Sequence, residues 1–119
     1  MLTQETDAAT EAAAAAAWAE ISDNGASILT RATGQRIQPE TPIHMVRTLL
    51  TGFELAALSR FRKYASTGEC RYAAAMLVAL GFGPDLQRTR PGKALLKTLD
   101  SYGIDNVLRR DIANAWLEV

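Results

Sequence analysis

One long amphipathic stretch, residues 41–64, most limits what this 119-residue chain can fold into. Apolar side chains recur in it at steps of three, four and seven residues, which is the spacing of one helix face. Thr41 can cap the first free N–H groups, and Pro42 suits the first helical position because it has no N–H to leave unpaired. The stretch therefore predicts a central helix over about residues 42–64. Its expected apolar face comprises Ile43, Met45, Val46, Leu49, Leu50, Phe53, Leu55, Ala57, Leu58 and Tyr64.

The composition favours helices packed on helices. Hydrophobic residues make up 48% of the chain, but 21 of them are alanines, which have the highest helix propensity and remove little apolar surface from water. The β-branched and aromatic residues that strands prefer are sparse. The length is that of one domain. We therefore expect an all-α fold, a compact bundle of about five helices in a single domain over residues 1–119.

The N-terminal third contains one clear helix and one ambiguous segment. Residues 3–22 predict an acidic, alanine-rich helix within residues 1–24, and Asn24-Gly25 is a stop signal. Because alanine hides any apolar stripe, the sequence leaves open whether this helix docks on the domain or stays detached from it. Residues 26–38 are either a short helix that ends at Gly34 or a hairpin that turns at Thr33-Gly34, and the helix is favoured.

Local signals divide the second half into further helices. Ser66 and Glu69 fit a capping box, and the helix that follows is expected to stop at Gly81 and to pack antiparallel on the central helix. Pro84 and Asp85 start one helical turn, and another helix begins at Pro91. The last helix, residues 106–117, follows a cap at Asp105. Its expected buried stripe is Leu108, Ile112, Ala115 and Trp116.

Charge is distributed unevenly although the net charge is zero. Residues 1–24 contain five acids and no base, whereas residues 60–97 contain eight bases and two acids. This asymmetry favours an acidic partner, either a phosphate backbone or an acidic protein, and Tyr64 and Tyr72 are aromatics that would stack on bases or border an interface. The candidate binding residues are Arg60, Lys63, Tyr64, Arg71, Arg88, Arg90, Lys93 and Lys97.

The sequence offers few residues that could form a catalytic or metal-binding site. Cys70 is the one nucleophile candidate, and a helix start together with Arg71 would lower its pKa. A nucleophile also needs a base, and no spacing rule places His44, the only histidine, beside it. Asp111, like the other aspartates nearby, is expected to be a helix-end residue. We therefore predict no enzyme, no catalytic residues, no metal site and no cofactor.

The sequence also favours a cytoplasmic protein. The N-terminus lacks the basic start and apolar block of a signal peptide, and the longest apolar run, residues 72–82, is too short to span a bilayer. A single cysteine suits a reducing compartment.

These observations predict a non-enzymatic binding module that acts through protein–protein contact, such as a small adaptor or inhibitor of a larger complex, including one that handles nucleic acid. Small inhibitors encoded by phages and mobile elements share this size and class, which is an analogy only. The alternative is a DNA- or RNA-binding protein that uses residues 60–97. Two helices joined by a tight turn have the outline of a helix-turn-helix, but the second is rich in alanine and leucine. Whether the chain forms homo-oligomers is left open.

Overall fold

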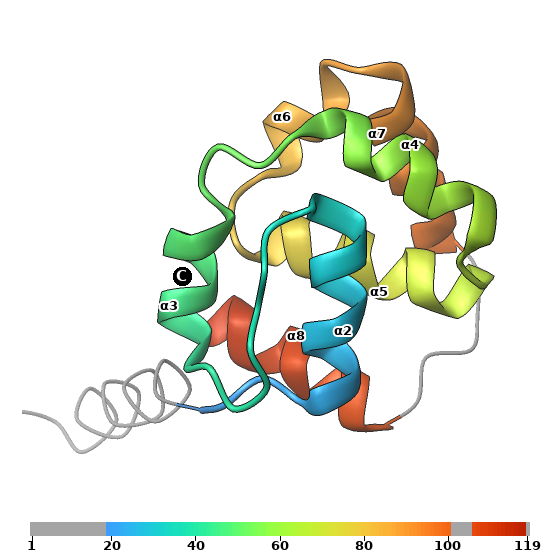
Figure 1. The fold of residues 1–119 in the computed structure, drawn as a ribbon. Coiled ribbons are helices and arrows are strands. Elements are labelled where there is room, and N and C mark those ends of the chain that lie inside the picture. Colours follow the sequence, from blue (N-terminus) through green and yellow to red (C-terminus); the bar gives the residue numbers. More distant parts are fainter. Residues whose placement is uncertain (1–18, 101–105, 119) are drawn as a thin grey trace, which may run out of the picture.

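The computed structural model describes residues 19–100 and 106–118, and this part of the chain is all-α, as the composition predicts. Within it, extended pairing is limited to an isolated bridge between Glu20 and Pro42. The helices, shown in Figure 1, are α2 (Asp23–Thr33), α3 (Ile43–Leu50), α4 (Leu55–Tyr64), α5 (Thr67–Ala79), α6 (Gly83–Gln87), α7 (Arg90–Leu96), the short 3-10 helix η1 (Lys97–Asp100) and α8 (Asn106–Glu118).

Helix α5 lies at the centre of the fold (Figure 1). It packs against α2, α7, η1 and α8, and Tyr72, Met76 and Leu77 on it are completely buried. Ala73 and Ala74 are buried as well, and side chains this small let neighbouring helices come close. The centre of the bundle is therefore formed by residues 67–79 and not by residues 42–64.

The predicted single helix over residues 42–64 is wrong, because the chain forms α3 and α4 there with a turn between them. Gly52 in this turn has a φ of 81°, a left-handed conformation that glycine adopts without strain. Phe53 then packs its ring edge-on against Phe82, with the ring centroids 5.6 Å apart. The prediction that Thr41 caps this helix is also wrong. The Thr41 hydroxyl donates to the carbonyl of Gln38, and Pro42 occupies the N-cap position of α3.

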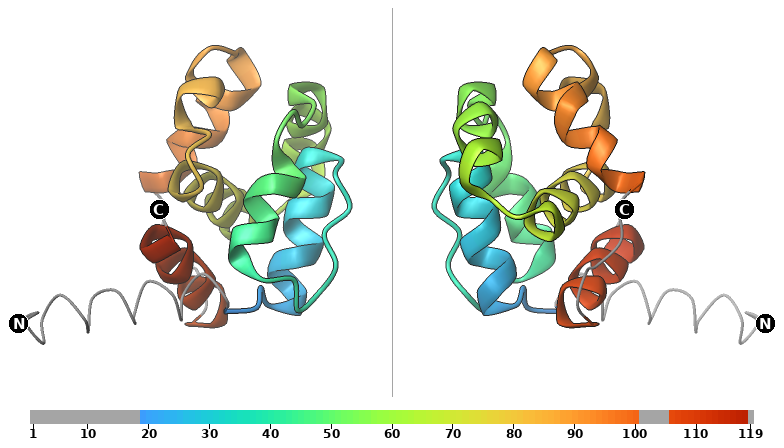
Figure 2. Two further views of the ribbon diagram at one scale, coloured as in Figure 1. Left: turned by 90° about the vertical axis from the view of Figure 1, so that its left-hand side faces the viewer. Right: turned by 90° about the vertical axis from the view of Figure 1, so that its right-hand side faces the viewer.

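The predicted antiparallel hairpin between the central helix and α5 is wrong too. Helix α4 packs against α2 and α7, whereas α5 packs against α8, α7 and α2. The turn at residues 65–66 thus separates two helices that both pack against α2 and α7, and not chiefly against each other. In Figure 2, α4 and α2 lie together on one side of the molecule, and α7 lies on the opposite side.

The predicted N-terminal helix lies mostly outside the described residues, but its predicted end at Ser22 is wrong. Residues 19–22 are not helical, and the Ile21 N–H donates to the Thr41 carbonyl at 2.9 Å. The Ser22 hydroxyl then caps α2 by accepting a hydrogen bond from the Gly25 N–H at 3.0 Å. The Asn24-Gly25 pair, predicted to end one helix, therefore lies in the first turn of the next.

Several local signals are confirmed. Helix α2 ends at Gly34, with φ 74°, so the segment after residue 26 is a helix and not a hairpin. Ser66 and Glu69 form the predicted capping box, with hydrogen bonds of 3.0 and 3.1 Å. Pro84 and Pro91 lie in the first turns of α6 and α7.

Helix α8 has the predicted position but a different buried side. Leu108 and Ala115 are buried and Ile112 is partly buried, as expected. Trp116, which was expected in the buried stripe, is 55% exposed, so this prediction is wrong. Asp111 was expected to be a helix-end residue, and this prediction is wrong: it lies within α8 and is only 3% exposed.

The buried Asp111 carboxylate joins three segments of the chain. It accepts hydrogen bonds from the Tyr72 hydroxyl at 2.9 Å and from the Ser22 hydroxyl at 2.5 Å, and the Ser22 N–H lies 3.2 Å from it. The chain packs so closely here that a Cβ added at Gly25 would lie 2.2 Å from the Tyr72 oxygen. Burial and the adjacent Asp111 charge raise the pKa of Tyr72, so its hydroxyl stays protonated as a donor.

Replacing this donor tests the contribution of the network. We expect Tyr72→Phe to lower the free energy of unfolding by about 1–3 kcal/mol, because the buried carboxylate loses one hydrogen bond and gains no water. Urea denaturation followed by circular dichroism measures the change. Tyr64→Phe is the matched control, since Tyr64 is 88% exposed and its hydroxyl is solvated. Equal stability of the two variants would contradict this role of Tyr72.

Candidate binding sites

The predicted basic residues are distributed over several helices. Arg60, Lys63 and Tyr64 lie on the exposed side of α4, Arg71 is partly buried on α5, and Arg88 follows α6. Arg90 and Lys93 lie on α7, and Lys97 lies at its C-terminal end. Tyr72, expected as a second stacking aromatic, is fully buried and unavailable to a partner, so that part of the prediction is wrong.

Three of these cations form an exposed strip, which we call the α7 ridge. Arg90, Lys93 and Lys97 follow one another at steps of three and four residues, so they share one face of α7 and its C-cap. Among the residues that the structure describes, none of the three is in an ion pair. Arg88 differs from them, because it lies 3.9 Å from Asp85 in an exposed pair that contributes little stability.

The C-terminal end of α4 packs against α2. Arg60, Phe61 and Tyr64 line a shallow hollow of about 220 Å³ together with Arg31 of α2. The Arg31 guanidinium lies 5.8 Å from the centroid of the Phe61 ring and is also paired with Glu69. The hydrogen bond from Arg31 and the backbone N–H of the capping box lower the pKa of Glu69. Because Glu69 is engaged in this way and α5 is central, α5 does not have the surface of a DNA recognition helix.

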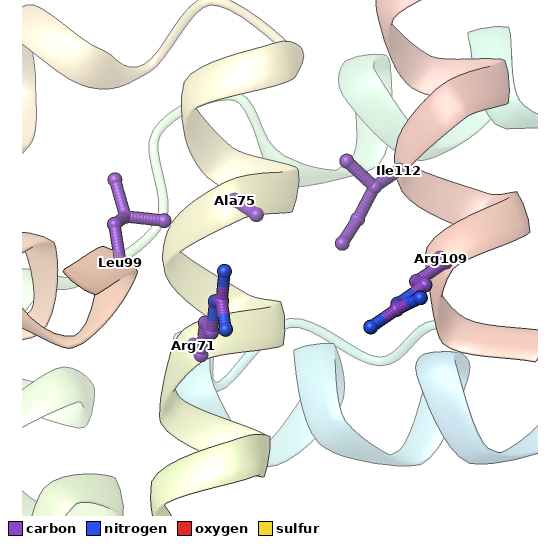
Figure 3. Close-up of a pocket in the computed structure, with 5 residues that line it drawn as sticks. All are labelled: Arg71, Ala75, Leu99, Arg109 and Ile112. Carbon is purple, nitrogen blue, oxygen red and sulfur yellow. The ribbon is translucent and has the colours of Figure 1, made fainter. Parts of the chain in front are cut away.

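A pocket of about 230 Å³ lies between α5, η1 and α8. Arg71 on α5 and Arg109 on α8 border it. Figure 3 shows the Arg109 guanidinium extending from α8 toward α5, and the Arg71 guanidinium in front of α5, below Ala75. Ala75, Leu99 and Ile112 form its apolar wall. Arg71 was a predicted binding residue, whereas Arg109 was not. No periodicity links the two positions, since their proximity depends on how α8 crosses α5.

Apart from Tyr64, the large apolar side chains that are exposed lie on two helices that pack against each other, α3 and α8. Met45 and Leu49 on α3 are 46% and 43% exposed, so the prediction that they widen the buried stripe is wrong. Trp116 and Leu117 in the last turn of α8 are more than half exposed. We call these four residues the α3–α8 apolar surface. The sequence identified these residues as apolar but did not predict that they are exposed. The spacing of apolar residues in a helix does not show where its buried face ends.

Cys70 does not have the properties of an activated nucleophile. It is buried, and burial raises the pKa of its thiol, an effect that the nearby Arg62 charge only partly offsets. The thiol is therefore protonated at neutral pH, contrary to the lowering that a helix start and Arg71 alone would cause. Within residues 19–100 and 106–118, no three histidine, cysteine or acidic side chains gather into a metal-binding group.

Comparison with known protein families, curated proteins and solved structures finds no match for this chain. In the described part of the chain, every helix is too short or too polar to cross a membrane. What the sites described above can bind is therefore inferred from the chemistry of the side chains that form them.

The ion pair between Arg31 and Glu69 predicts a pH-dependent contribution to stability. Because the pKa of folded Glu69 lies below its ordinary value of 4.5, the contribution is complete above that pH and is lost as the pH falls through the folded pKa. We expect Glu69→Gln, which can keep the cap, to cost at most about 1 kcal/mol at pH 7 and nothing at the acid end. Urea denaturation from pH 7 to pH 3 measures this difference.

Glu54→Gln is the control, because Glu54 is exposed and makes no side-chain capping bond. Its stability difference from the parent chain should stay near zero across the series. A Glu69→Gln difference that does not shrink toward acid would show that the carboxylate charge contributes nothing.

Proposed function

We propose that this protein is a non-enzymatic, cytoplasmic binding module, an adaptor or inhibitor, and that it docks on a partner protein through the α3–α8 apolar surface. The partner presents an apolar patch with a polar border. The observation that carries the proposal is the exposure of Met45, Leu49, Trp116 and Leu117 on two helices in contact.

The residue types support this assignment. Methionine and tryptophan are enriched in the buried centres of protein interfaces, and a cluster of exposed large apolar side chains is uncommon on a monomer that binds nothing. Both helices are fixed from behind: Ile43, Val46 and Leu50 anchor α3 in the core, and Leu108 and Ala115 anchor α8. A surface held this rigidly pays little ordering entropy when a partner binds.

Removing the apolar side chains of α3 tests the proposal. We expect Met45→Ser with Leu49→Ser to abolish capture of a stoichiometric partner from lysate of the source organism. Both side chains are partly exposed, so we expect the variant to stay folded, which circular dichroism checks. Val107→Ser is the matched control. Val107 is 54% exposed but lies at the opposite end of α8. Quantitative mass spectrometry of the captured material compares the three proteins.

The outcomes separate the alternatives. A partner retained by Val107→Ser and lost by the double variant supports docking through this surface. A partner retained by all three proteins, or none captured by any, counts against it. Sedimentation equilibrium at two concentrations identifies the remaining case. If the protein forms a dimer that the α3 substitutions dissociate, the partner is a second copy of this chain.

A second candidate function is favoured by the α7 ridge. Three cations without ion-pair partners among the described residues, on one exposed face, suit contacts with the phosphates of DNA or RNA. Such contacts would be independent of sequence, because a ridge of lysine and arginine on a short helix offers little geometry for reading bases.

A salt series tests this candidate. If all three cations contact phosphates of a duplex, the slope of log K against log salt is about −2.7, from roughly −0.9 per contact. Arg90→Gln with Lys93→Gln and Lys97→Gln should remove binding in a fluorescence anisotropy titration. The control with the same charge loss is Arg36→Gln with Arg60→Gln and Lys63→Gln. Equal effects of the two triple variants, or no binding at low salt, would contradict a specific role for the ridge.

A further inference from the structure

The pocket between α5, η1 and α8 brings two like charges toward the same small space. The Arg71 and Arg109 guanidinium groups both border it, and Ala75, Leu99 and Ile112 supply the apolar part of its lining (Figure 3). Arg71 is partly buried, whereas Arg109 is more exposed. Across the described residues, neither arginine has a carboxylate within ion-pair distance.

This arrangement favours an anion on physical grounds. Two guanidinium groups that border one small space repel each other, and a cation partly removed from water loses hydration that a polar partner would replace. An anion between them removes the repulsion and gains charge-assisted hydrogen bonds from two planar forks. The other side chains that line the pocket are apolar, so they favour an apolar body on the ligand.

We propose that this pocket binds a carboxylate carried on a short apolar body. A carboxylate has two oxygens in one plane, which two guanidinium forks can satisfy, and an apolar body attached to it can pack on Ala75, Leu99 and Ile112. The volume of about 230 Å³ is below the 300–1,000 Å³ range of drug-sized ligand sites, which favours a small ligand.

Two sources can supply this chemistry: a free aliphatic or aromatic acid, and the C-terminus of a peptide that ends in an apolar residue. Both place one carboxylate between the arginines and one apolar group against the wall. The proposal is independent of docking through the α3–α8 apolar surface, since the residues that line the pocket are not part of that surface.

The experiment uses the full chain and follows the side-chain Nε–H resonances of arginine by NMR during titration. The probes are hexanoate, hexanamide as its uncharged counterpart, and acetate as a carboxylate without the apolar body. We expect hexanoate to shift the Arg71 and Arg109 signals saturably, and to bind at least tenfold more tightly than either of the other two. Equal affinity for hexanoate and acetate would show a general anion site and overturn the proposal.

Variants show whether the two arginines act together. Arg71→Met and Arg109→Met should each weaken hexanoate binding by at least tenfold, whereas Arg110→Met, the matched control on the exposed side of α8, should leave it unchanged. Circular dichroism confirms that each variant is folded. Hexanoate that does not bind the parent chain at 50 mM, or that binds all three variants equally, would contradict the pocket.

A peptide pair distinguishes the sources. Acetyl-Gly-Ser-Leu with a free C-terminus and the same peptide with a C-terminal amide are titrated alongside hexanoate. Tighter binding of the free-acid peptide than of hexanoate, with the amide inactive, identifies a peptide terminus as the ligand. Hexanoate binding with no binding of either peptide identifies a small free acid. Equal binding of the acid and amide peptides would show that the carboxylate is not recognised and would overturn the proposal.

Discussion

The hydrogen bonds to the buried Asp111 carboxylate fix the positions of three segments of this fold. Tyr72 connects it to α5 and Ser22 connects it to the start of α2, over sequence separations of 39 and 89 residues. A buried carboxylate is stable only when its oxygens are hydrogen-bonded, so this contact selects one orientation of α8 on α5. The same orientation builds the pocket, because Arg71 precedes Tyr72 by one residue and Arg109 precedes Asp111 by two.

Local sequence signals predicted two helix ends correctly, whereas the cap at Thr41 and the stop at Asn24-Gly25 were wrong. The capping box at Ser66 and the stop at Gly34 depend on residues close in sequence, and both are confirmed. The helix over residues 42–64 was wrong because the apolar spacing continues through the turn, and one glycine is also tolerated inside a helix at a cost of about 1 kcal/mol. What turns Gly52 into a break is packing, including the contact of Phe53 with Phe82.

The binding sites were less predictable than the helices. Of the two pocket arginines, Arg71 was found from the basic content of residues 60–97, and Arg109 was missed because it lies outside that stretch. Met45 and Leu49 were identified as apolar and assigned to the core, since spacing alone does not set the width of a buried face. Asp111 gave no signal, because a carboxylate is usually solvated at a helix surface. Each of these outcomes depends on which helices meet in the folded chain.

The central position of α5 explains why the candidate sites lie on the outer helices. Its alanines let α2, α7 and α8 surround it, so most of its surface is buried. From its second turn onward, the residues that reach solvent are the partly buried Arg71, Ala75 and Val78, at steps of four and three, and two of the three line the pocket. The pocket is thus one place where the central helix itself contacts solvent, while α3, α7 and the end of α8 carry surfaces that the core does not need. Substitutions on those outer surfaces can change binding without removing a core contact.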